Sequence, residues 1–171
     1  MERPTDTEYA SFYARYVALV PETDILAVLD SQVGEIRRLA GSLPAEREGY
    51  RYAEGKWSIR QVLGHLVDAE RVFGYRAFCF SRGEQAALPS FDENEYVAGA
   101  RSDATPLVEL VDELALVRRS NLVVLRRLVP AEWARVGTAS GKPVSVRALA
   151  WVMAGHPRHH LGVLKERYGV A

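Results

Sequence analysis

The sequence predicts an all-α protein, a four-helix bundle in one domain that spans residues 1–171. Apolar residues recur every three or four positions in four long segments, which is the spacing that buries one face of a helix. No stretch alternates apolar and polar residues convincingly enough to predict a strand. Hydrophobic residues make up 48% of the 171 residues and charged residues 26%, so one sizeable core can form.

The N-terminal part predicts an arm followed by the first long helix. Residues 1–22 are rich in aromatic side chains, and their spacing favours an arm or a short helix lying on the bundle. Thr23 or Asp24 can cap the helix that follows, whose apolar stripe covers residues 25–39. The turn-forming residues of segment 41–44 end this helix.

The second helix has a clear start and is followed by a long connection. Ser58 and Gln61 form a capping box, in which each side chain binds the backbone N–H of the other residue. An apolar stripe covers residues 59–80, with His65 beside it. Residues 83–104 show little periodicity and are too many for a bundle loop, which usually has about 2–8 residues. We interpret this segment as a crossover between the second and third helices.

The C-terminal part predicts two further helices and a second connection. Thr105 caps the third helix, Pro106 occupies its first position, and the apolar stripe runs towards Pro130. Residues 130–143 contain glycine and proline and form an irregular connection. The last helix covers residues 145–168.

Two features of the last helix are unusual. Ala148, Gly155 and Gly162 form a stripe of small residues at seven-residue spacing, which would let a neighbouring helix approach closely. Pro157 lies inside the helix and cannot donate a hydrogen bond to the carbonyl of Met153. We expect a kink here, with a free carbonyl that either holds a water beside the site described next or only shapes the packing.

The histidines point to a metal site. The chain has four of them, and His156 and His160 lie one turn apart on the predicted core face of the last helix. Together with His65 from the second helix they would form an open three-ligand site, the arrangement that catalytic metals need. The alternatives are that His65 is an ordinary core residue, and that His159 replaces His160. His159 is turned about 100° away from His160, so the core stripe favours His160.

Other polar residues of the second helix have weaker functional interpretations. Asp68 lies one turn beyond His65 and could support it from behind, and Arg76 could bind an anionic substrate. Glu70 and Arg71 are expected to be solvated or paired charges. Cys79 is too far along the helix to be a ligand and is expected to be a buried structural thiol. The histidine pair lacks the glutamate of the HExxH motif, which argues against a zinc protease of that class.

Charge and hydropathy exclude several classes of protein. Lys and Arg together number 22, as do Asp and Glu, so no net charge recruits nucleic acid or an anionic membrane. No apolar run approaches the roughly 18 residues of a membrane span, and the N-terminus lacks the apolar segment of a signal peptide. A single cysteine rules out an internal disulfide and fits a reducing compartment. We therefore expect a cytoplasmic protein that binds neither nucleic acid nor membranes.

Three segments resemble the DinB-like (DinB/YfiT) superfamily of metal-binding four-helix bundles. They are YAEGKWSIRQVLGHLVDAER at residues 52–71, LPSFDENEYV at 88–97 and PVSVRALAWVMAGHPRHH at 143–160. With the helix pattern they cover the chain from about residue 16 to 168. The resemblance implies an up-down-down-up bundle, which accounts for the long crossover. It also implies a homodimer and a divalent metal, Ni or Zn, on His65, His156 and His160.

One departure and several activities follow from this resemblance. Pro157 occupies a position where the family often has glutamate, so any supporting role of that glutamate is lost. Members of the superfamily include transferases and isomerases that use bacillithiol or mycothiol, and metal-dependent hydrolases. Our main hypothesis is a metal-dependent enzyme that activates a low-molecular-weight thiol, such as bacillithiol, for transfer to a small electrophilic substrate. A hydrolase that uses water instead, and a non-catalytic bundle that binds metal or dimerises, are the alternatives. No catalytic residue can be assigned.

Overall fold

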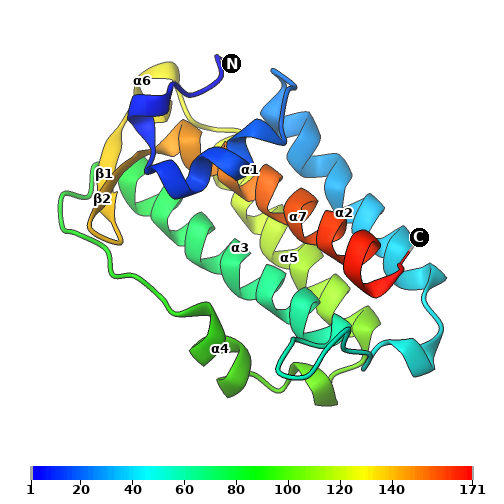
Figure 1. Ribbon diagram of the computed structural model, residues 1–171. Coiled ribbons are helices and arrows are strands. Elements are labelled where there is room, and N and C mark those ends of the chain that lie inside the picture. Colours follow the sequence, from blue (N-terminus) through cyan, green and yellow to red (C-terminus); the bar gives the residue numbers. More distant parts are fainter. Residues whose placement is uncertain (1, 171) are drawn as a thin grey trace.

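The computed structural model describes residues 2–170 and confirms the all-α four-helix bundle. Figure 1 shows the long helices α2, α3, α5 and α7 packed against one another, with α6, β1 and β2 at one end of the bundle, α1 lying on α7 and α4 beside α3. The helices and strands, in chain order, are α1 (Ala14–Ala18), α2 (Ile25–Ser42), α3 (Ile59–Ser81), α4 (Glu93–Gly99), α5 (Leu107–Leu125), α6 (Pro130–Trp133), β1 (Val136–Ala139), β2 (Lys142–Ser145) and α7 (Val146–Tyr168).

The bundle has the expected up-down-down-up order. Helices α3 and α5 run in parallel, because Gly64 near the start of α3 faces Ser102 just before α5, and Gly74 further along faces Asn121 near the end of α5. Helices α2 and α7 run in the opposite direction (Figure 1). Two consecutive parallel helices need a connection as long as the bundle, and residues 82–106 supply it.

The predicted helix starts of α2 and α3 are confirmed in detail. Asp24, not Thr23, caps α2, since its carboxylate accepts a hydrogen bond from the backbone N–H of Ala27 at 3.1 Å. Ser58 and Gln61 form the predicted capping box at α3, with both reciprocal hydrogen bonds at 3.0 Å. These caps fix where each helix begins, and therefore which residues face the core.

The connection before α7 is not irregular as predicted. The third helix ends at Leu125, and the following residues form the short helix α6 and a β-hairpin in which Val136 pairs with Ser145 and Ala139 with Lys142. A two-residue turn at Ser140 and Gly141 joins the strands, and both residues have the positive φ that such turns require. The strands are only four residues long, too short for the alternation of side chains to be recognised in the sequence.

The hairpin anchors the crossover. Leu88 donates its N–H to the carbonyl of Thr138 at 2.8 Å and accepts the N–H of Ser140 at 3.1 Å. Beyond this point the crossover turns into α4, which Asp92 caps through hydrogen bonds from the backbone of Asn94 and Glu95. The crossover is thus held along the open side of α3. None of the described helices is both long and apolar enough to cross a membrane.

The N-terminal arm, for which the sequence analysis named no partner helix, contains α1 and packs on α7. A Cβ atom at Gly155 would come within 2.0 Å of the carbonyl oxygen of Tyr16, so α1 packs directly on the backbone of α7. Gly162 has nothing within 4 Å of such an atom. The small-residue stripe therefore admits a neighbour at Gly155, and the neighbour is the arm of the same chain.

Helix α7 continues through Pro157 as one helix. The carbonyl of Met153, which Pro157 leaves without its helical partner, accepts a hydrogen bond from the guanidinium of Arg118 at 3.1 Å. Arg118 is itself buried and forms an ion pair with Glu70 at 2.7 Å. From the sequence we expected this carbonyl either to hold a water or only to shape the packing. The structure favours packing, because a side chain from α5 binds the carbonyl in place of a water.

Candidate metal centre

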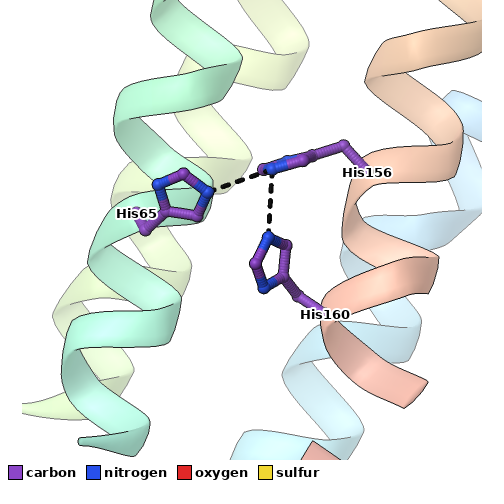
Figure 2. A group of neighbouring side chains, drawn as sticks. All are labelled: His65, His156 and His160. Atoms are coloured by element: carbon purple, nitrogen blue, oxygen red, sulfur yellow. Dashed lines mark hydrogen bonds between the residues drawn. The ribbon is translucent and has the colours of Figure 1, made fainter. Parts of the chain in front are cut away.

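Three imidazole rings converge from two helices (Figure 2). Nε2 of His156 lies 3.0 Å from Nε2 of His65 and 3.1 Å from Nε2 of His160. One ring nitrogen from each histidine lies within 4.8 Å of the others. The structure therefore brings the three predicted residues to a common point, across the interface between α3 and α7.

The local sequence explains this convergence. His65 lies on the buried face of α3 between the core residues Val62 and Leu66, so its ring points towards α7. His156 and His160 are four residues apart and face α3 from the same side of α7. His65 and His156 are each only 5% exposed, and His160 is half-buried. The pairing of an i, i+4 motif with a third residue from the antiparallel helix is what the sequence predicted.

The buried rings are uncharged at neutral pH. Burial lowers the pKa of His65 from 6.5 to about 4, and the negative charge of Glu93 opposes this only in part. Burial and the neighbouring histidines lower the pKa of His160 to about 3, and the same causes lower that of His156 well below its ordinary value. A neutral imidazole is the form that binds metal ions.

The donor set fits a divalent metal. In a neutral imidazole each nitrogen either donates or accepts one hydrogen bond, so three Nε2 atoms at one point cannot all satisfy one another. A cation such as Zn²⁺ or Ni²⁺ takes a lone pair from each nitrogen, and three protein ligands leave a position open for substrate. His65, His156 and His160 are the residues that could hold such an ion.

The expected contact of Asp68 with the far side of the His65 ring is absent. Nδ1 of His65 is buried and has no hydrogen-bond partner among the residues that the structure describes. Asp68 lines a neighbouring pocket with Arg71 and Tyr75, which shares Arg76 with the histidine cavity, and it makes no hydrogen bond to His65, so its predicted role behind His65 is wrong. The ring of Trp57 packs against His65 instead, with 4.9 Å between centroids. On the Nδ1 side, packing rather than a hydrogen bond orients this imidazole.

A cavity of about 330 Å³ opens beside the three histidines. Tyr16, Trp57 and Phe73 form aromatic walls, while Arg15, Arg76 and Glu93 bring charge into it. This volume suits a small molecule. The three histidines thus lie on the wall of a cavity instead of in a sealed core.

His159 lines the same cavity without joining the cluster. Its ring packs against Tyr16 at 5.5 Å and His160 at 5.1 Å between centroids, and it is half-buried. Among the described histidines, the ones that bring their nitrogens together are His65, His156 and His160. The preference for His160 over His159 in the sequence analysis agrees with this geometry.

Glu93 is the residue that the sequence analysis missed. It is the first residue of α4 and lines the cavity opposite the predicted helices. Its negative charge opposes part of the lowering of the His65 pKa by burial. The signal was present in the sequence, since Asp92 followed by Glu93 and Glu95 is a typical helix start within the crossover.

The remaining candidate residues have structural or peripheral positions. Glu70 pairs with Arg118 inside the bundle and Arg71 pairs with Glu113 on its surface, as expected for structural charges. Cys79 is a free, half-buried thiol packed against the core. Arg76 is the exception, because it is buried and lines the cavity.

Fold and site together define a four-helix bundle with an inward-facing cluster of three histidines beside a small-molecule cavity. The chain belongs to the DinB superfamily, whose family model matches residues 29–164. A search of curated proteins gives no match.

Two solved structures are similar. YfiT from Bacillus subtilis, described as a probable metal-dependent hydrolase with an unusual four-helix bundle topology, superposes with a TM-score of 0.77 at 16% identity. The match covers 99% of this chain and 95% of YfiT. A mycothiol-dependent maleylpyruvate isomerase superposes with a TM-score of 0.67 at 14% identity, over 91% of this chain and 63% of the isomerase. At these identities the likeness establishes the fold.

Proposed function

We propose that this protein is a metal-dependent enzyme that transfers a low-molecular-weight thiol to a small electrophilic substrate. His65, His156 and His160 hold the metal, and the adjoining cavity holds the reactants. The observation that carries the proposal is the convergence of three neutral imidazoles on the wall of an accessible cavity. A non-catalytic metal site would need no such cavity.

The residues of the chain supply binding and proton transfer. A divalent cation on the three imidazoles provides Lewis acidity, which favours the deprotonated form of a thiol or of water. Trp57 and Phe73 shield the reacting groups from bulk water. Glu93 is the carboxylate positioned to accept the proton that the thiol loses, because it faces the same cavity as His65.

Hydrolysis is the second candidate function. It is supported by the fold shared with YfiT, described as a probable metal-dependent hydrolase, and by Glu93, which could equally take a proton from water. Thiol transfer is supported by the fold shared with the mycothiol-dependent isomerase. The two functions need the same histidines and differ in the nucleophile that enters the cavity.

The test begins with metal content. Protein purified without a metal-affinity tag is analysed by elemental analysis and then stripped and reloaded with Zn²⁺ or Ni²⁺. We expect about one ion per chain. His65→Ala and His160→Ala should lose it, whereas His159→Ala, a matched change in the same cavity, should keep it. Equal metal content in all of these proteins would contradict the assignment of ligands.

Activity then separates the two functions. Metal-loaded and metal-free protein are incubated with bacillithiol or mycothiol and a panel of small electrophiles, and separately with esters and amides in the absence of thiol. Thiol consumption that requires the metal supports transfer, and turnover without thiol supports hydrolysis. If metal-loaded and metal-free proteins behave alike in both assays, the enzyme proposal fails.

A further inference from the structure

Arg76 is a buried cation without a counter-charge. Arg76 is only 2% exposed, yet no carboxylate among the described residues lies within 4.0 Å of its guanidinium. Its hydrogen-bond partners are neutral: the carbonyl of Pro89 at 2.7 Å, the hydroxyl of Ser140 at 3.0 Å and the hydroxyl of Tyr13 at 3.3 Å. Burial of an unpaired charge is unfavourable, so the position calls for an explanation.

Arg118 shows how this protein neutralises a buried arginine that has a structural role. Arg118 is as deeply buried as Arg76, and Glu70 receives it through two hydrogen bonds of 2.7 and 2.9 Å. Both arginines are buried in the same protein. Arg118 is paired with a carboxylate, whereas Arg76 has none and lies between the histidine cavity and the neighbouring pocket of Asp68 and Tyr75.

The position of Arg76 relates it to the histidines. It lies eleven residues after His65 on α3, which is about three turns and about 16 Å along the axis, so both side chains share one face of the helix. Arg76 and the histidines line one cavity, so the guanidinium and the cluster face the same space. Tyr13 from the arm and Ser140 from the hairpin turn complete this end of the cavity.

Charge in the cavity favours an anion. Arg15 also lines it, and the hydroxyl of Tyr16 is the partner of its guanidinium at 2.9 Å. Glu93 supplies the one carboxylate among the described residues that line the cavity, and its charge acts on His65 at the other end. Arg15 and Glu93 both act on the histidines, so their opposite charges meet at that end of the cavity. Arg76 is then the one charged side chain at its own end among the described residues that line the cavity, and that end is positive.

We infer that the Arg76 end of the cavity is a binding subsite for a carboxylate of the substrate. The guanidinium of Arg76 binds the carboxylate, assisted by the hydroxyls of Tyr13 and Ser140, while the reactive group of the same molecule reaches the histidines. The substrate is therefore a small organic anion. This inference rests on the proposed function and adds the substrate class to it.

Paired probes test the subsite. Each pair consists of an alkyl hydroxamate, which binds metal ions, with either a carboxylate or a carboxamide at its far end, in a set of chain lengths. Affinities are measured by isothermal titration calorimetry with metal-loaded and metal-free protein. We expect the carboxylate to bind about 10- to 100-fold more tightly than the amide at the matching length, the range for a charge-assisted hydrogen bond.

Two variants assign this preference to Arg76. Arg76→Met should abolish the difference between carboxylate and amide while leaving the hydroxamate bound to the metal. Arg71→Met, a matched change on the same helix outside the histidine cavity, should preserve it. Arg76→Met should also unfold at no lower urea concentration than the wild type, because it removes an unpaired buried charge. A purely structural role would lower that midpoint and leave the carboxylate preference intact.

The outcomes distinguish failure of the carboxylate subsite from failure of the proposed metal centre. Equal binding of carboxylate and amide to the wild type at every length, or a preference that survives in Arg76→Met, would overturn the subsite. If no hydroxamate gains affinity from the metal, the proposed metal centre fails. The difference between carboxylate and amide in metal-free protein then still decides the role of Arg76.

Discussion

The buried ion pair between Arg118 and Glu70 makes a quantitative prediction for stability. Arg118→Met leaves the Glu70 carboxylate in the interior without its counter-charge, and it removes the donor to the Met153 carbonyl that Pro157 leaves free. Both side chains are only 2% exposed, so water cannot replace what is lost. Removing one partner of a buried pair costs about 3–5 kcal/mol. For a protein of this size that lowers Tm by about 6–20 °C.

The assay is urea denaturation of metal-free protein at pH 7, followed by circular dichroism. Arg71→Met is the matched control, since Arg71 pairs with Glu113 on the surface and both are about half exposed, which limits the cost to at most about 1 kcal/mol. The double variant Glu70→Met with Arg118→Met should recover much of the loss, because no unpaired charge remains. If Arg118→Met costs no more than the control, or the double variant is the least stable of all, the reasoning is wrong.

Three other features make predictions. Gly155→Ala should destabilise the fold by about 2–3 kcal/mol, because the new methyl group meets the Tyr16 backbone, whereas Gly162→Ala should be neutral or stabilise it by up to about 1 kcal/mol; urea denaturation compares them. Metal-free protein should lose stability as pH falls from about 7 to about 4, since the unfolded histidines take up protons near pH 6.5 and the buried ones do not; urea midpoints across this range test it. The pKa of Glu8 is about 2, because hydrogen bonds, first among them those from Arg147, outweigh the effect of burial. Glu8→Gln should therefore cost about 1 kcal/mol above pH 4.5, and thermal melts should show this difference vanishing as pH falls towards 2.

The helices and the histidine cluster could be predicted because their signals are local. The capping box of Ser58 and Gln61 and the spacing of His156 and His160 are each contained within one turn of helix. The third ligand required one further step, the expectation that two apolar faces pack together. His65 lies on such a face, so burial of that face decides where its ring points.

The rest of the site depends on contacts between segments far apart in the sequence. The hairpin could not be predicted, because four-residue strands carry little signal of their own, and its contact with Leu88 of the crossover joins segments far apart in the sequence. Glu93 reaches the cavity because the hairpin holds the crossover against the bundle. The role predicted for Asp68 was wrong because it was inferred from local spacing alone. Helical spacing alone put it behind His65, but the rotation of α3 directs it into another pocket.

Pro157 shows how a local break in the helical pattern is accommodated. A proline inside α7 removes one helical hydrogen bond just after a metal-ligand candidate, which would loosen the helix where the site needs rigidity. The structure compensates from across the bundle, since Arg118 binds the freed Met153 carbonyl and Gln32 binds the next one, Ala154, at 2.6 Å. The ion pair that holds Arg118 therefore also stabilises the backbone that carries His156. Stability and site geometry are coupled here, and a loss of metal affinity should accompany the loss of stability in Arg118→Met.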